Sequence, residues 1–211
     1  NGIGDAFQST PVLKNMKARL PEAKIDVLVS ASAKGILENN PYVNRIFTLP
    51  LQPPKEKIKI IAKKLKPVKY DLIINLASRN STEKLVECLT SRWKININYF
   101  YRERFTDVML GFKNNDSSFI QSEFNLLQKI GFEPKKYHPE IFLKNKEVED
   151  ARHFLNSHGF TAKEKLVIFH PFSSDSLREW KIEQFIDLAK RLDDTYKFNI
   201  VFVGAKNEIE K

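Results

Sequence analysis

Short runs of β-branched and other apolar residues alternate along the chain with longer stretches in which apolar residues recur every three or four positions. The short runs predict strands, the longer stretches predict amphipathic helices, and their alternation is typical of parallel strands joined by crossover helices. Strands are predicted over residues 25–29, 72–76, 95–97, 166–169 and 199–203. Helices are predicted over residues 11–20, 33–38, 55–65, 81–89, 118–130, 148–158 and 182–192. The sequence therefore predicts an α/β fold built on parallel sheets.

Residues 132–144 interrupt this pattern with two prolines and several polar residues. Such a stretch favours a passage between domains over a further helix or strand. We therefore predict a first domain over residues 1–135, a linker over 136–145 and a second domain over 146–211. Gly131 and Gly159 each follow a helical pattern directly, which predicts that they cap the helices before them.

Both predicted domains look incomplete. The second has two strands and two helices, although a parallel sheet is normally covered on both faces. The opening residues, Asn1-Gly2-Ile3-Gly4-Asp5, resemble a loop that leaves a strand, and that strand is not in the sequence. We expect a longer natural protein, with its first strand missing here and its second domain truncated.

The composition is that of a globular protein. Of the 211 residues, 42% are hydrophobic and 29% are charged, which excludes disordered and fibrous classes. No apolar run approaches the roughly 20 residues that cross a bilayer, and no signal peptide opens the chain. The single cysteine, Cys88, has no partner for a disulfide. These features predict a soluble protein of the reducing cytoplasm.

The net charge of +9 favours anionic partners, but charge alone does not choose among nucleic acid, a phospholipid surface and a phosphorylated sugar. The basic residues are concentrated in one stretch, which we call the basic segment. It consists of Lys55, Lys57, Lys59, Lys63, Lys64, Lys66 and Lys69. An ordinary solvated helix face is an equally good interpretation of this segment.

The first candidate site is the Gly2–Asp5 segment, before Ser9-Thr10-Pro11 opens a helix. Glycines let a backbone approach a ligand, and the N–H groups at a helix start favour an anion. A carboxylate in such a loop can act as a general base toward a sugar hydroxyl. A simple turn explains the same residues, because Asp beside Gly is common in turns.

The second candidate is the polar loop that follows the strand over residues 166–169 and contains Ser173, Ser174 and Arg178. Open α/β sheets bind ligands at the carboxyl ends of their strands. Hydroxyl groups can bond phosphate oxygens, and a guanidinium can hold a diphosphate with two hydrogen bonds. The structural alternative is an ordinary helix cap with Trp180 packed in the core, and for Trp180 itself we favour packing.

The third candidate is the strand ending at Val203, followed by Gly204 and then by Glu208, whose carboxylate can meet a ribose hydroxyl. Taken alone, this pattern is better explained by a strand followed by a solvated helix start.

In this order, the three segments resemble the lipopolysaccharide heptosyltransferases (glycosyltransferase family 9). The resemblance covers nearly the whole chain. The matching stretches are 4–13, 20–29, Asn40-Pro41-Tyr42-Val43-Asn44, Tyr70-Asp71-Leu72-Ile73-Ile74-Asn75-Leu76, 77–81 and 173–180, the last of which is similar to the Lys-x-Trp-Pro motif of the family.

The resemblance implies a GT-B fold of two Rossmann-like domains and an inverting transfer of a heptose-like sugar from an ADP-linked donor. It implies that Asp5 is the catalytic base. The implied donor-binding residues are Ser173, Ser174, Arg178 and Glu208. The implied acceptor-binding residues are Gly4, Lys55, Lys57 and Arg79, facing a phosphorylated lipid-linked sugar of lipopolysaccharide-core type at the inner membrane surface.

Two residues depart from the family pattern, because Arg178 stands where lysine is usual and Lys181 where proline is usual. The later Asp-Thr-Gly…His segment of the family does not occur within the 211 residues. No carboxylate cluster has metal-ligand spacing, so we expect no metal and no other cofactor. The alternative is a non-catalytic module that binds nucleotides or polyanions. Nucleic acid is not the expected partner, because aromatic residues are not interleaved with the basic segment.

Overall fold

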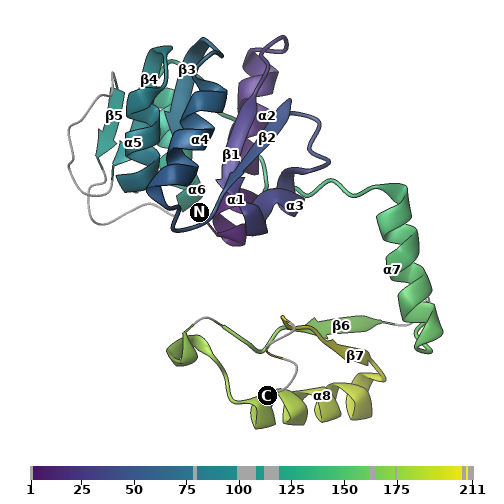
Figure 1. Cartoon of the computed structure of the whole chain (residues 1–211). Helices are drawn as coiled ribbons and strands as arrows, with labels where there is room; N and C mark the ends of the chain where they lie inside the picture. The colour runs from purple at the N-terminus through teal and green to yellow at the C-terminus, as the bar shows by residue number, and fades with distance from the viewer. Residues whose placement is uncertain are drawn as a thin grey trace. The chain divides into compact units, whose positions relative to one another are not determined.

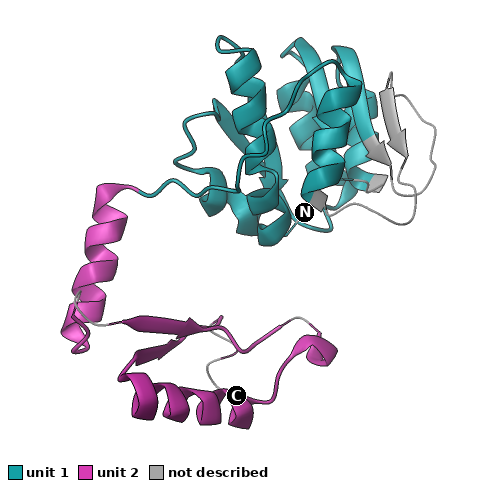
Figure 2. Cartoon of the chain, turned by 180° about the vertical axis from the view of Figure 1, so that it is seen from behind, with its two compact units in different colours: residues 1–143 teal, residues 144–211 magenta. Residues whose placement is uncertain are grey.

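The computed structural model describes residues 2–77, 80–98, 108–111, 119–161, 165–173, 175–205 and 208. The chain divides into two compact units, residues 1–143 and residues 144–211 (Figure 2).

Unit 1 is an α/β unit whose strand pairs, among the described residues, are parallel. Its elements are α1 (Ile3–Gln8), α2 (Thr10–Arg19), β1 (Asp26–Ser30), η1 (Ala31–Ala33), α3 (Lys34–Leu37), β2 (Arg45–Leu49), α4 (Lys55–Leu65), β3 (Tyr70–Asn75), α5 (Asn80–Cys88), β4 (Ser91–Asn98), β5 (Val108–Gly111) and α6 (Phe119–Lys129). Strand β1 pairs with β2, and β3, β4 and β5 form a second sheet in that order. Asp26 lies opposite Arg45, and Tyr70 lies opposite Ser91.

Helices cover both faces of these strands (Figure 1). On one face, α4 and α5 bury Leu65 and Leu85 against Phe47 of β2. On the other face, α6 buries Leu126 against Ile95 of β4. Because β1 and β3 are apolar on consecutive positions, each of these strands can pack against helices on both sides.

An apolar cavity of about 260 Å³ lies between β1 and β3. Consecutive residues of both strands line it, residues 27–29 of β1 and 72–74 of β3. Successive side chains of a strand point to opposite faces, so a cavity lined in this way passes through the plane of the sheet. At the start of the strands, the hydroxyl of Tyr70 crosses this gap and donates to the Asp26 carboxylate at 3.0 Å.

The predicted fold class is confirmed, and all five predicted strands and seven predicted helices appear within a few residues of their expected bounds. Helix α4 has the predicted bounds. The sequence analysis missed β2, β5 and α1. Strand β2 had a usable signal, because Ile46-Phe47-Thr48-Leu49 is a short run of β-branched and apolar residues.

The glycine caps are also confirmed. Gly131 and Gly159 both have φ of +85°, a conformation that glycine adopts without strain. After Gly131, the amide of Phe132 donates to the carbonyl of Leu127 at 3.0 Å, and Phe132 packs against the core around Leu127. This combination is the Schellman arrangement, and it turns the chain back toward α2.

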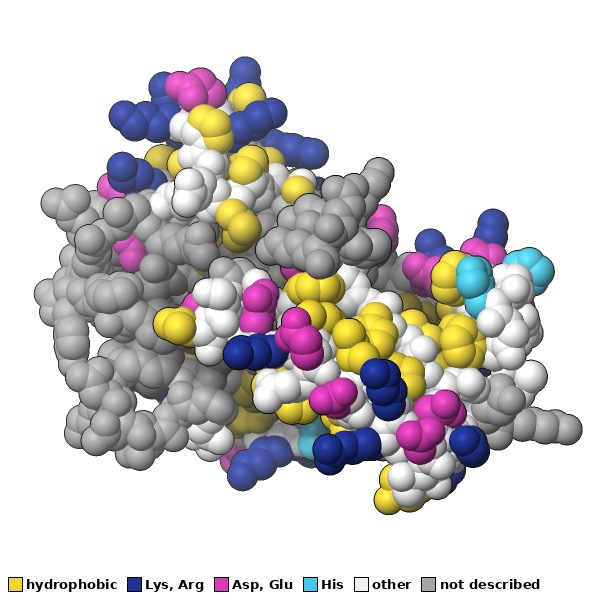
Figure 3. All heavy atoms as spheres, turned by 90° about the horizontal axis from the view of Figure 1, so that it is seen from below, with side chains coloured by type: hydrophobic (Ala, Val, Ile, Leu, Met, Phe, Trp, Pro, Cys, Tyr) yellow, Lys and Arg dark blue, Asp and Glu magenta, His cyan; other side chains and the backbone are white. Residues whose placement is uncertain are grey.

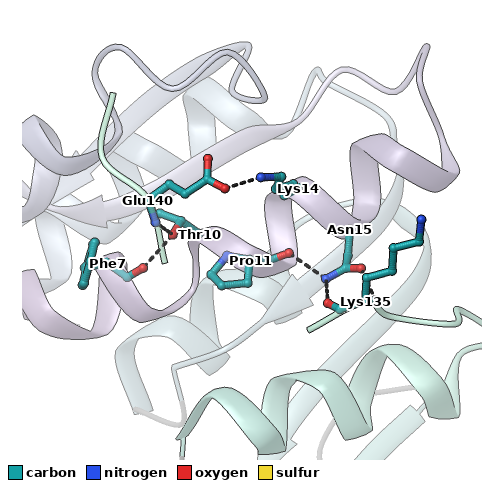
Figure 4. A network of polar contacts seen from close by, with 7 residues as sticks. All are labelled: Phe7, Thr10, Pro11, Lys14, Asn15, Lys135 and Glu140. Atoms are coloured by element: carbon teal, nitrogen blue, oxygen red, sulfur yellow. Dashed lines mark hydrogen bonds and ion pairs between the residues drawn. The ribbon is translucent and has the colours of Figure 1, made fainter. Parts of the chain in front are cut away.

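The chain that follows α6 lies along α2 (Figure 4). Asn15, which is 5% exposed, donates to the carbonyl of Lys135 at 3.0 Å and accepts from its amide at 2.7 Å. The amide of Glu140 donates to the Thr10 hydroxyl at 2.9 Å, and the Glu140 carboxylate pairs with Lys14. Residues 135–140, part of which lies in the predicted linker, are therefore held against α2 by partly buried polar contacts.

Unit 2 contains α7 (Asn145–Ser157), β6 (Leu166–Phe169), η2 (Ser176–Arg178), α8 (Ile182–Tyr196) and β7 (Asn199–Phe202). Strands β6 and β7 are parallel, with Leu166 opposite Asn199. Helix α8 packs on one face through Phe185, whose ring lies 5.4 Å from that of Phe169. On the other face, Ile168 is 60% exposed. The apolar sheet of this unit is thus covered on one side within the residues that the structure describes.

In the described part of the chain, no helix combines the length and the apolar character that a membrane span requires.

Candidate functional site

Asp5 lies in a helix, and the predicted glycine-rich loop is wrong at this point. Residues Ile3–Gln8 form α1, whose contacts with α3 and η1 offset the weak helix propensity of Gly4. Asp5 occupies the third helical position, where its Oδ2 accepts the Gly2 amide at 2.8 Å. No other hydrogen bond to this carboxylate forms among the described residues, and Asp5 is only partly buried. One of its oxygens therefore caps the helix, and the other can accept a proton.

A second carboxyl lies close to Asp5 and was missed by the sequence analysis. Glu123 of α6 is 1% exposed, and its Oε1 lies 2.6 Å from the Ser9 hydroxyl. Burial raises the pKa of Glu123 to about 8, and the charge of Asp5 adds to this shift, whereas a hydrogen bond donated by Ser9 to the ionised carboxylate opposes it. A signal existed in the sequence, because Glu123 occupies an apolar position of the helical repeat formed by Ile120, Phe124 and Leu127.

The predicted acceptor residues lie in different parts of unit 1. Gly4 is exposed on α1, beside Asp5. Lys55 and Lys57 are exposed on the first turn of α4, which follows the carboxyl end of β2. Arg79 lies outside the described residues. Strands β1 and β2 run parallel, so their carboxyl ends lie at the same edge of the sheet. The turn η1, which follows β1, contacts α1.

The basic segment covers the exposed side of α4 and the turn after it. Figure 3 shows basic side chains gathered at its upper left edge, with apolar side chains between them. On α4 and in the turn after it, Lys59, Lys63 and Lys66 are exposed, and Ile60 of the same helix is 60% exposed. The surface therefore combines positive charge with an apolar side chain.

The polar loop after β6 is organised by its own side chains. The Glu179 carboxylate accepts the amide of Ser173 at 2.8 Å, and the Asp175 carboxylate accepts the amide of Leu177 at 3.1 Å and caps η2. The Arg178 guanidinium lies 3.5 Å from Asp175 and its side chain is 67% exposed. Ser174 lies outside the described residues. The Ser173 hydroxyl accepts the Asp175 amide at 3.4 Å, and the Arg178 side chain is exposed to solvent.

Trp180 lies beside this loop but not in a core. It is 47% exposed, with its ring 5.1 Å from that of Phe185. The packing that we favoured for Trp180 is therefore a half-exposed contact on α8.

The loops after β6 and β7 meet at the carboxyl ends of the two strands. A Cβ atom at Gly204 would lie 3.0 Å from the ring of Phe172 and 3.4 Å from Oε2 of Glu208. The same Glu208 oxygen accepts the amide of Ala205 at 2.6 Å. Glycine at 204 thus permits the close approach that brings Glu208 to the loop of Ser173.

Within each unit, the predicted residues that the structure describes lie toward the carboxyl ends of the strands. Asp5 and Gly4 belong to unit 1, whereas Ser173, Arg178 and Glu208 belong to unit 2. Among the described residues, no group of three or more His, Cys, Asp or Glu side chains is arranged to hold a metal ion.

Comparison with solved structures defines the class of fold. The chain matches the glycosyl transferase family 9 from Veillonella parvula DSM 2008 with a TM-score of 0.90 and 19% identity, over 100% of this chain and 62% of that one. It matches the Escherichia coli ADP-heptose lps heptosyltransferase II with a TM-score of 0.81 and 18% identity, over 100% of this chain and 64% of that one. The fold is therefore that of the GT-B glycosyltransferases.

Comparison of sequences gives the family. The model of glycosyltransferase family 9 (heptosyltransferase) matches residues 58–211, and the chain belongs to this family. Lipopolysaccharide heptosyltransferase 3 of Escherichia coli is 32% identical over 139 residues, which are 61% of this chain and 40% of that protein. The same enzyme from strain K12 is 34% identical over 105 residues, 47% of this chain and 30% of that protein. The chain thus matches less than half the length of these curated relatives.

Proposed function

We propose that this protein transfers a heptose-like sugar from an ADP-linked donor to a phosphorylated acceptor of the lipopolysaccharide-core type, with inversion at the anomeric carbon. The match to the family over residues 58–211 carries this proposal. The Escherichia coli heptosyltransferase WaaC with ADP-2-deoxy-2-fluoro heptose has the same fold, with a TM-score of 0.72, which supports an ADP-linked sugar as donor.

In the proposed reaction, Asp5 takes the proton of the acceptor hydroxyl while that oxygen attacks the anomeric carbon. The bond between the anomeric carbon and the diphosphate breaks on the opposite face, and the nucleoside diphosphate leaves with its electron pair. The position of Asp5 supports this role, because a partly buried carboxylate with one oxygen free can accept a proton.

Turnover of ADP-heptose by Asp5→Asn tests the base. Asparagine keeps an oxygen that can accept the Gly2 amide, so the cap of α1 persists while the basic group is lost. We expect nucleotide release to fall at least 100-fold, against no change in the control Asp71→Asn, whose side chain is exposed on β3. Unchanged turnover by Asp5→Asn would show that another group removes the proton.

For the donor, we propose that Ser173, Ser174 and Arg178 hold the diphosphate and that Glu208 meets the ribose. The exposed guanidinium of Arg178 supports this assignment, because it can stabilise the charge that develops on the leaving group. In Arg178→Ala, we expect the Kd for ADP to rise about 10-fold to 100-fold. Arg178→Lys should recover most of the affinity, and Arg191→Ala, on the exposed side of α8, should not change it.

For the acceptor, we propose that Gly4 and Arg79 border its sugar, and that Lys55 and Lys57 attract its phosphates. We also propose that the protein acts in the cytoplasm and touches the inner membrane surface through the basic segment. The exposed side chain of Ile60 supports membrane contact, since an apolar group among lysines suits an anionic bilayer surface.

Vesicle binding tests this contact. The variant K55Q/K57Q/K59Q/K63Q should lose binding to vesicles that contain phosphatidylglycerol, and the control K146Q/K190Q, whose lysines lie in unit 2, should not. Equal binding by both variants across salt concentrations would show that the basic segment does not contact the membrane. Steep salt dependence of oligonucleotide binding, with no sugar transfer from any donor, would instead favour the non-catalytic polyanion-binding module.

We further propose that residues 1–135 form the acceptor-side domain and residues 146–211 the start of a nucleotide-sugar domain. The cavity between β1 and β3 supports the expected extra strand in the first domain. Among the described residues, β1 and β3 each have one strand neighbour, and the cavity between them is apolar on both sides of the sheet plane. These are the surroundings that a central parallel strand requires.

A further inference from the structure

Two hydrogen bonds, both partly buried, connect α6 through Ser9 to the backbone of Asp5. The Ser9 hydroxyl oxygen lies 2.9 Å from the carbonyl oxygen of Asp5 and 2.6 Å from Oε1 of Glu123. Ser9 is the residue between α1 and α2, and its own amide donates to the same Asp5 carbonyl at 3.1 Å. Glu123 is 1% exposed, and its Oε2 has no partner in the described part of the chain.

The Ser9 hydroxyl lies within donating distance of both oxygens, but its single proton cannot serve both contacts at once. A serine hydroxyl has one proton to donate, and a backbone carbonyl can only accept. If the proton of Ser9 points to the Asp5 carbonyl, the Ser9 oxygen has to accept a proton from Glu123. Both contacts are then full hydrogen bonds only when the carboxyl of Glu123 is protonated.

The surroundings of Glu123 favour the same state. The elements packed against α6 present apolar side chains, such as Val12 from α2 and Ile95 from β4. The charged group that acts on Glu123 is Asp5, which has the same sign, and burial raises the Glu123 pKa to about 8. A buried carboxylate with an unpartnered oxygen would be far more costly than the neutral acid.

We propose that Glu123 is a positioning residue for Asp5, because its neutral carboxyl donates to Ser9, Ser9 donates to the Asp5 carbonyl, and this relay fixes the junction of α1 and α2. The inference rests on the proposed role of Asp5 as the base. Ionisation of Glu123 removes the first donor of the relay and adds a second negative charge beside Asp5. Sugar transfer should therefore decline as the pH rises past the range in which Glu123 keeps its proton.

Infrared spectroscopy tests the relay without any substrate. At pH 7, we expect the wild-type protein to show the carbonyl band of a buried protonated carboxylic acid. This band should be absent from Glu123→Gln and present in Glu133→Gln, which removes an exposed acid from the same unit. A wild-type spectrum without the band would overturn the proposal.

Two measurements test the positioning itself: exchange of the Ser9 amide, which requires no activity, and kcat, which does. In Glu123→Leu, which keeps the bulk and loses the donor, exchange of the Ser9 amide should rise at least tenfold and kcat should fall at least tenfold. Glu123→Gln carries a neutral donor at every pH, so it should recover kcat to within about threefold and lose the alkaline decline. Unchanged amide exchange in Glu123→Leu, or an alkaline limb that persists in Glu123→Gln, would contradict the positioning role.

These readouts separate the two proposals. If the wild-type protein transfers no sugar, the proposed function fails, and the infrared band with the amide exchange still decides the relay. If transfer occurs and the band is missing, the relay fails alone.

Discussion

The phenol of Tyr70 donates a hydrogen bond to the carboxylate of Asp26 at 3.0 Å, across the cavity that separates β1 from β3. Arg45 and Asn44 donate to the same carboxylate, whose side chain is 6% exposed. This group therefore joins three strands at the start of the two sheets of unit 1, where strand-to-strand hydrogen bonds between β1 and β3 are absent among the described residues.

The first prediction is that Asp26→Asn destabilises unit 1 in a pH-dependent way. Burial by itself raises the pKa of Asp26, but hydrogen bonds from Arg45, Asn44 and Tyr70 outweigh it, so the pKa lies below its ordinary 3.8. The carboxylate thus contributes stability above pH 3.8 that is lost as the pH falls through the lower folded-state pKa. Urea unfolding should show a loss of about 2 kcal/mol at pH 7, which shrinks below pH 3.8. Asp71→Asn, an exposed neighbour, should change little.

The second prediction is that Asn15→Ala releases the chain after α6. Asn15 exchanges two hydrogen bonds with the backbone of Lys135 and is buried, so its removal leaves an amide and a carbonyl without partners. We expect a loss of about 2–3 kcal/mol in the free energy of unfolding. Residues 132–143 should also become cleavable by protease. Gln8→Ala, at an exposed position, is the control, and equal stability of the two variants would refute the anchoring role.

The third prediction is that Glu123→Gln is more stable than the wild type at neutral pH. Folding raises the Glu123 pKa from 4.5 to about 8, so the wild-type protein loses stability as the pH rises between these values. One pKa unit corresponds to about 1.4 kcal/mol. At pH 7, the free energy of unfolding of the glutamine variant should therefore exceed that of the wild type by about 3 kcal/mol. Thermal unfolding from pH 4.5 to pH 8 measures the difference, which should grow with pH. A constant difference would mean that Glu123 is ionised in the folded protein.

The fourth prediction concerns Gly204. An added methyl group would press on the Phe172 ring at 3.0 Å, so Gly204→Ala should displace the loop that holds Ser173. We expect about 1–2 kcal/mol of local destabilisation, seen as faster hydrogen exchange at the Val203 amide, which donates to Phe169. Gly35→Ala is the matched control, because a Cβ there meets no atom within 4 Å. Equal exchange in both variants would show that the Phe172 ring moves aside without a loss of stability.

The sequence was sufficient for most elements because their patterns repeat over many residues. Helix α4 and strand β6 were predicted with their observed bounds, since apolar spacing alone fixes which side of each element is buried. Helix α1 was not predictable in the same way. Gly4 within it and Gly2 before it favour a loop locally, and the helix is stabilised by α3 and η1, which contact it from elsewhere in the chain.

The residues of the candidate site also fall into those that local sequence predicts and those that depend on distant contacts. Asp5, Ser173, Arg178 and Glu208 stood out because residue type and local motif are properties of short stretches. Glu123 did not, although it interrupts an apolar helix face, because its partner Ser9 lies 114 residues away along the chain.

By itself, the sequence determined the α/β class, the parallel strands, the glycine caps and the family resemblance, all of which depend on periodicity and short motifs. The tertiary structure decided which polar groups are buried together: Glu123 with Ser9, Asn15 with Lys135, and Tyr70 with Asp26. The physical reason is that desolvation and hydrogen-bond pairing depend on distance in space, and residues distant along the chain acquire their partners only when it folds.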